Sequence, residues 1–222
     1  MRGHALLTRA ACAAMAFVSF GLLLYAVACA SEWEKVSDKS GVLIERRPVA
    51  GTGFYEVRAT VHSSLPPGVI FDTLWNHRDY TLFIPHLKRL DLLSATDDEH
   101  IVYEQVEVPL ARDRDYTVRL KKQVDAAAQR YGIRFATAND AGPPPDGSHV
   151  RVSKIQGSWT IELGADGKGS VIRYDVQTEP GGSIPSFVTN LAQREAVAAL
   201  VHAVLKRAQT LYGPEIRTRP TQ

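Results

Sequence analysis

Apolar and polar side chains alternate along several stretches of this chain, which is the pattern of a half-buried β-strand. Residues 54–62 show it most clearly, because Val57, Ala59 and Val61 share one face and polar side chains fill the other. The pattern predicts strands over 42–47, 54–62, from about 87, and over 101–109, 116–124, 130–138, 150–163 and 171–179, after a short polar lead-in at 33–39.

Two segments have helical spacing instead. The first starts at Pro66-Pro67, where proline is tolerated because its missing N–H would be unpaired in a first helical turn. A second short helix or turn is predicted over 77–83, ended by Pro85. A much longer helix is predicted from Pro185 to about Leu211, with Gly213-Pro214 as its stop and 213–222 as a polar tail.

The order of these elements predicts an α+β fold. Two strands and a helix pair precede about six antiparallel strands, and one long amphipathic helix ends the domain. A large sheet needs cover for its apolar face, so we expect it to curl around the C-terminal helix. Such a sheet encloses a volume that side chains do not completely fill, which is a good site for an apolar ligand.

The first thirty residues have the layout of an export signal. Arg2 and Arg9 give a basic start, and no charged residue follows from 10 to 28. Three outcomes stay open: cleavage after Ala30, lipidation of Cys29 in an imperfect lipobox, or retention as an anchor. Each predicts that the domain at 31–212 is exported to the periplasm or the cell envelope.

Composition excludes several classes of function. The net charge is +2 and the basic residues are scattered, so we expect no nucleic-acid partner. The only cysteines are Cys12 and Cys29, which leaves no internal disulfide, thiol chemistry or cysteine-ligated metal in the body. The seven histidines lack metal-binding spacing, and neither a G-x-S-x-G elbow nor a phosphate loop occurs. We therefore expect neither a cofactor nor an enzyme.

Three stretches resemble one known family. Val69–Trp75, followed by Tyr80 and Phe83-Ile84-Pro85, is similar to a helix pair that ends in an aromatic turn. Val108–Leu110, followed by Arg112–Tyr116, resembles a proline and Arg-Asp corner between two central strands. Gly181–Pro185, with Val188 and Asn190, resembles the opening of a terminal helix. Together they resemble the helix-grip fold of the StAR-related lipid-transfer (START) domains and the wider Bet v 1-like, or SRPBCC, superfamily.

The resemblance implies that a lipid or another hydrophobic small molecule binds between sheet and helix. We expect a monomer that contacts membranes transiently and whose loops at Gly181-Gly182 or 143–145 open to admit the ligand. Two alternatives remain: an aromatase or cyclase of the same superfamily, and a protein-interaction module whose cavity is filled by its own side chains.

Candidate cavity residues follow from the predicted faces. Tyr103 and Gln105 share one face of their strand, and a buried glutamine needs partners, so we expect this face to look into a wet or ligand-filled space. Glu195 is expected to pair with Arg134 as a polar anchor, and the cluster Arg112–Asp115 to fix a strand corner through ion pairs. The full predicted lining is Phe83, Tyr103, Gln105, Arg134, Trp159, Ile161, Ile184, Phe187, Val188, Leu191 and Glu195.

Overall fold

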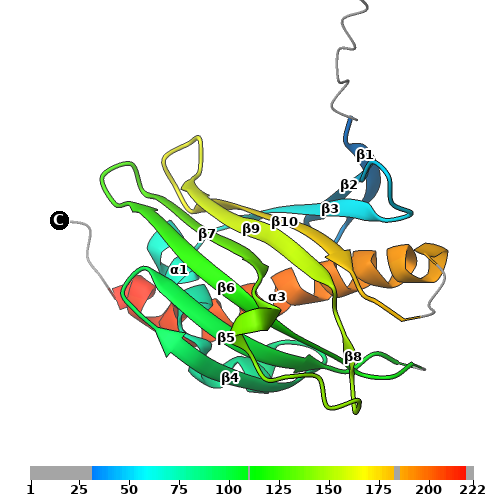
Figure 1. Ribbon diagram of the computed structural model, residues 1–222. Coiled ribbons are helices and arrows are strands. Elements are labelled where there is room, and N and C mark those ends of the chain that lie inside the picture. Colours follow the sequence, from blue (N-terminus) through cyan, green and yellow to red (C-terminus); the bar gives the residue numbers. More distant parts are fainter. Residues whose placement is uncertain (1–31, 110, 183–185, 219–222) are drawn as a thin grey trace, which may run out of the picture. The chain divides into compact units, whose positions relative to one another are not determined.

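One twisted sheet holds every strand of the described residues (Figure 1). In the computed structural model, residues 32–109, 111–182 and 186–218 are described, without the side chains of 186–189, 191–192 and 214–218. The strand order is β1-β2-β3-β10-β9-β7-β6-β5-β4, all antiparallel, and β8 pairs with β6 in parallel. The strands are β1 (Glu34–Lys39), β2 (Val42–Pro48), β3 (Tyr55–Ser63), β4 (Leu87–Ala95), β5 (Glu99–Val106), β6 (Arg114–Asp125), β7 (Arg130–Thr137), β8 (Val150–Arg151), β9 (Lys154–Leu163) and β10 (Ser170–Glu179).

Helices lie along one side of this sheet (Figure 1). Two of them are long enough to cover it: α1 (Pro67–Trp75) and α3 (Ser186–Thr218). The 3-10 turn η1 (His77–Asp79) and the short α2 (Tyr80–Phe83) follow α1, and a second 3-10 turn, η2 (Asn139–Ala141), follows β7. Pro67 stands in the first turn of α1, as the sequence predicts.

The core lies between the concave face of the sheet and the two long helices. Val57, Ala59 and Val61 of β3 are buried, which confirms the face predicted from their alternation. The apolar stripe of α3 is also confirmed, since Val201 and Val204 belong to the same buried cluster. From α1 the cluster takes Ile70, Phe71 and Leu74. The predicted α+β helix-grip architecture is therefore the observed one.

Two strand predictions are wrong. The polar lead-in at 33–39 contains β1, which pairs with β2 through a bulge between Lys35 and Ser37. The single strand predicted over 150–163 is broken after Arg151, because Val152 turns its N–H to the carbonyl of Asp115 in β6. An apolar run does not reveal such a break, since both halves have the same residue preferences.

The end of the last helix also differs from the prediction. Gly213 and Pro214 do not stop α3, which continues to Thr218. Proline removes one hydrogen bond and strains the preceding turn, but that cost does not by itself end a long helix. The export-signal prediction for residues 1–30 falls outside the described residues, as does the tail from 219 on. Within the described ranges, no helix has both the length and the apolar composition that crossing a bilayer requires.

Candidate functional site

Polar side chains form a row along the concave side of β5 and β6. The two strands pair so that His100 faces Leu120, Val102 faces Val118 and Glu104 faces Tyr116. Val102 and Val118 are fully buried, which places their neighbours of the same parity on the covered face. Glu104 and Tyr116 therefore lie inside the molecule, among apolar side chains, yet both retain partly accessible surface.

Glu104 and Tyr116 form the centre of this row. The Tyr116 hydroxyl donates a hydrogen bond of 2.6 Å to Oε2 of Glu104. Burial raises the pKa of the Glu104 carboxyl above its usual value, although the bond from Tyr116 works in the opposite direction. Burial and the nearby Glu104 charge raise the pKa of Tyr116 well above its usual value. The phenol thus donates to a carboxyl group whose pKa is raised by its burial.

Two further tyrosines approach the same carboxyl group. Burial first, and the charge of Glu104 second, raise the pKa values of Tyr80 and Tyr174. The Tyr80 hydroxyl donates to the carbonyl of Leu74 at the end of α1. The ring of Tyr174 packs 4.3 Å from that of Trp159 and 6.0 Å from that of Phe135, measured between centroids. The acid is therefore surrounded by aromatic surface with few polar groups.

Two histidines extend the row beyond Tyr80. The His77 ring lies 4.8 Å from Tyr80 and 5.1 Å from His100, and the His100 ring stacks on Trp75 at 4.0 Å. Within the described chain, neither ring nitrogen of His77 has a hydrogen-bond partner. Burial lowers the pKa of His77 to about 4, with a smaller effect from His100. Burial, then Lys122, lowers the pKa of His100. Both imidazoles are therefore neutral at neutral pH.

The predicted placement of Tyr103 and Gln105 in the cavity is wrong. Both lie on the opposite, convex face of β5, where Gln105 donates to the Tyr103 hydroxyl and that hydroxyl donates to Asp115 at 3.0 Å. The guanidinium of Arg151 binds Asp115 from the other side. The expected partners of a buried glutamine are thus present, but they belong to a structural network behind the sheet.

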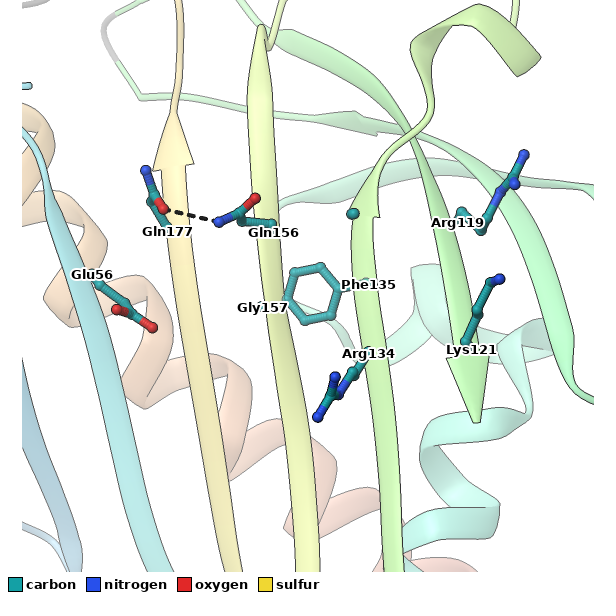
Figure 2. Close-up of a pocket in the computed structure, with 9 residues that line it drawn as sticks. Glu56, Arg119, Lys121, Arg134, Phe135, Gln156, Gly157 and Gln177 are labelled. Atoms are coloured by element: carbon teal, nitrogen blue, oxygen red, sulfur yellow. Dashed lines mark hydrogen bonds between the residues drawn. The ribbon is translucent and has the colours of Figure 1, made fainter. Parts of the chain in front are cut away.

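Arg134 also points to the convex face. It lines a depression of about 460 Å³ together with Glu56, Gln156 and Gln177 (Figure 2). The neighbouring cations of this depression, Arg119 and Lys121, pair with Glu99 at 3.6 and 3.2 Å. Phe135, Ala136 and Gly157 add apolar surface to the lining, but the depression is open to solvent and four charged side chains surround it, which does not suit the burial of an apolar ligand.

The predicted pairing of Glu195 with Arg134 is wrong as well. The Glu195 side chain is 73% exposed on α3 and lies 3.5 Å from Arg194. Since α3 packs on the concave side, the sheet separates Glu195 from the convex-face Arg134. The helical spacing of 185–211 does not say which positions of its first half face outward.

The remaining predicted residues divide into two groups. Trp159 and Ile161 are buried on the concave face, and Phe83 is half-buried at the end of α2, packed against the same core. Their contact with a ligand stays a prediction. Ile184, and the side chains of Phe187, Val188 and Leu191, lie outside the described residues.

The sequence patterns do not identify Glu104, Tyr116, Tyr80 and the two histidines as a group. In 101–106 apolar residues occur on both faces, so the alternation does not assign Glu104 to either one. The alternation in 116–124 is clearer, because Tyr116 has the same parity as Val118 and Leu120 and is thereby assigned to the apolar face. Over the described ranges, no group of three or more His, Cys, Asp or Glu side chains is placed to hold a metal ion.

Comparison with known proteins agrees with this architecture. The chain is 26% identical to the phosphatidylcholine transfer protein of Rattus norvegicus over 187 residues, covering 82% of this chain and 86% of that protein. A crystal structure of a STAR-related lipid transfer protein from Xanthomonas axonopodis superposes with a TM-score of 0.73 at 24% identity, covering 80% of this chain and 98% of the other. Human STARD10 superposes with a TM-score of 0.70 at 20% identity, covering 86% and 78%.

These two superpositions identify the fold as that of the START domains. Residues 63–205, more than half of the chain, match the family described as polyketide cyclase / dehydrase and lipid transport. The match includes β4 to β10, α1 and most of α3, and therefore all the residues of the concave polar row. The chain belongs to the polyketide cyclase / dehydrase and lipid transport family.

Proposed function

We propose that this protein binds a lipid or a similar amphiphile between the concave face of the sheet and α3, without breaking or making a bond. The observation that supports this most directly is the Glu104–Tyr116 pair, which places polar groups at 2.6 Å from each other in an apolar, covered environment. Buried polar groups that keep some accessible surface are suited to orienting a ligand.

The apolar part of such a ligand has a matching surface. Leu120 lies on the same concave face as Tyr116 and is only half-buried, and Phe135 packs between it and Tyr174. Transfer of hydrocarbon from water onto this surface stabilises the complex by about 25 cal/mol per Å² of buried apolar area. The Glu104 carboxyl and the Tyr116 phenol then bind a polar group of the ligand, which fixes its orientation.

The family resemblance supports a lipid, since the phosphatidylcholine transfer proteins are related over most of their length. We further propose that the protein is exported and carries its ligand through the periplasm or cell envelope as a monomer, with transient membrane contact. The uncharged run at 10–28 supports export.

A cyclase-type enzyme is the second candidate. The raised pKa of Glu104 would suit a general acid, and the family description includes polyketide cyclases. Catalysis would also require a base that reaches the same substrate atom. The nearest imidazoles, His77 and His100, are packed against aromatic rings instead, which favours binding over turnover.

Uptake of fluorescent lipid from phosphatidylcholine vesicles tests the proposal. We expect saturable uptake by the wild-type protein and at least a several-fold weaker uptake by a Leu120→Asp variant, which places a charge on the apolar surface. An Arg134→Gln variant, altered on the convex face, is the matched control and is expected to bind like the wild type. Absence of uptake by folded wild-type protein would contradict the proposal.

A further inference from the structure

Arg114 is a buried cation without a carboxylate partner. Among the described residues only two Lys, Arg, Asp or Glu side chains are buried, Arg114 and Asp115, each 4% exposed. Asp115 points to the convex face and is neutralised by Arg151. Arg114 has the opposite parity in β6, that of Tyr116, and lies on the concave face. An unpaired charge is costly to bury, so its presence at this position indicates a functional role.

Among the described residues no carboxylate forms an ion pair with Arg114, and only the charge of Asp113 opposes the lowering of its pKa. Its Nη1 donates to the carbonyl of Arg112, and its Nη2 donates to that of Gly181 over 3.4 Å, which is long for a hydrogen bond. The Asp113 carboxylate next to it is bound to Lys88 at 2.9 Å. Burial, reinforced by Arg112, lowers the pKa of Arg114.

One edge of the guanidinium has almost no hydrogen-bond partners, although it is buried. Nε of Arg114 has no hydrogen-bond partner within the described chain, and Nη2 has only the long contact with Gly181. Arg151 shows what this same edge can bind, because its Nε and Nη2 hold the two carboxylate oxygens of Asp115 at 2.9 and 2.8 Å. An oxyanion in the same position on Arg114 would complete the identical two-point geometry.

A glycine lies beside this edge. Gly182 follows β10 with a φ of +71°, and a Cβ built on it would lie 3.6 Å from Nη2 of Arg114. Any larger side chain at 182 would therefore extend into the space beside the guanidinium. The neighbouring residue, Gly181, also has a positive φ, of +66°, so this backbone course favours glycine at both positions.

We propose that Arg114 binds the anionic group of the ligand, a phosphate or carboxylate, through its Nε and Nη2. This inference rests on the proposed function and narrows it to amphiphiles with an oxyanion. On the same face, Glu104 and Tyr116 lie one step further along the β5–β6 pair, because Val106 faces Arg114 and Glu104 faces Tyr116. The ligand would thus meet a cation at its anionic group and a carboxyl–phenol pair beside it.

The test compares two fluorescent lipids, phosphatidylglycerol and diacylglycerol, each offered in phosphatidylcholine vesicles, with inorganic phosphate as a competitor. We expect the wild type to prefer phosphatidylglycerol by about tenfold or more, because a charge-assisted bidentate contact contributes a difference in affinity of this size. In Arg114→Gln this preference should fall to less than about twofold, whereas Arg134→Gln should keep it. Arg114→Lys keeps the charge without the planar fork and should retain only part of the preference.

Each other outcome is informative. Equal uptake of both lipids by wild type and Arg114→Gln would overturn the inference and leave the proposed function intact. Uptake of neither lipid by folded wild type would overturn the proposed function, and phosphate binding that depends on Arg114 would then assign the site to a free ion. Urea unfolding controls for structure: loss of stability in Arg114→Gln with unchanged lipid preference would show that Arg114 only ties down the backbone at Gly181.

Discussion

The guanidinium of Arg151 holds both carboxylate oxygens of Asp115, although the two residues are 36 positions apart in the chain. Nε lies 2.9 Å from Oδ1 and Nη2 lies 2.8 Å from Oδ2. This pair attaches β8 to β6 behind the sheet, and it lowers the pKa of Asp115 through the bond from Arg151.

Removal of one partner of this pair should be strongly destabilising. In Asp115→Ala, Arg151 is left without its counter-charge, and we expect the free energy of unfolding to fall by about 3–5 kcal/mol in urea titrations. The double variant with Arg151→Ala should lose less than the sum of the two single variants. Asp38→Ala, which breaks the exposed Lys35–Asp38 pair, is the control and should cost less than about 1 kcal/mol. Additive losses in the double variant would argue against direct coupling.

The Tyr116 hydroxyl should stabilise the protein through Glu104. Tyr116→Phe removes the donor of the 2.6 Å bond and leaves a buried acid without it, so we expect a loss of about 1–3 kcal/mol in unfolding free energy. The carboxyl pKa of Glu104, followed by NMR, should rise further because the bond from Tyr116 lowers it. Tyr55→Phe, which deletes a hydroxyl without a hydrogen bond to the described residues, should be neutral. An unchanged Glu104 pKa would mean that the two groups do not interact in solution.

Gly157 lies where the sheet has no room for a side chain. A Cβ at this position would stand 2.0 Å from the carbonyl oxygen of Asp175 and 2.7 Å from Cζ of Phe135. Because backbone of the paired strand β10 has to move, we expect Gly157→Ala to lower the unfolding free energy by about 3 kcal/mol. Gly132→Ala, on the adjacent strand β7, is the control, since its Cβ would meet no atom closer than 3.5 Å. Equal stabilities of the two variants would contradict this reading of the β9–β10 contact.

Stability should depend on pH through His77. The pKa of this imidazole is about 4 in the folded protein, against an ordinary value of 6.5 that we assign to the unfolded chain. Between these values the unfolded chain binds a proton that the native state does not. The unfolding free energy should therefore have its full value above pH 6.5. It should decline as the pH falls towards 4, by about 3 kcal/mol in all.

A variant separates this contribution from other titrating groups. In His77→Phe the decline between pH 6.5 and 4 should be smaller, because the group that protonates on unfolding is gone. His202→Gln, on an exposed position of α3, should retain the wild-type profile. Identical profiles for wild type and His77→Phe in urea titrations at several pH values would exclude His77 as the source.

Local sequence patterns predict most of the secondary structure and the fold class. They fail where contacts between distant parts of the chain determine the face of a residue or the end of a strand. The parity of Val57 and Val61 is enough to place β3, because only one of its faces is apolar. In β5 both faces contain apolar residues, so Tyr103 was assigned to the wrong one. The break between β8 and β9 depends on the backbone pairing of β8 with β6, a contact with a distant part of the chain that the residues near the break do not indicate. The ligand candidates Glu104 and Arg114 emerge only when the strand register is known.

The position of β10 has a consequence for how the chain folds. This strand lies between β3 and β9, pairing residues 56–63 with residues 170–177. The ladder that joins the first three strands to the rest of the sheet therefore spans more than a hundred residues and should close slowly. During synthesis, the free edge of β3 has no strand to pair with until β10 has left the ribosome. The nascent protein thus remains incomplete, and accessible to chaperones, for most of its translation.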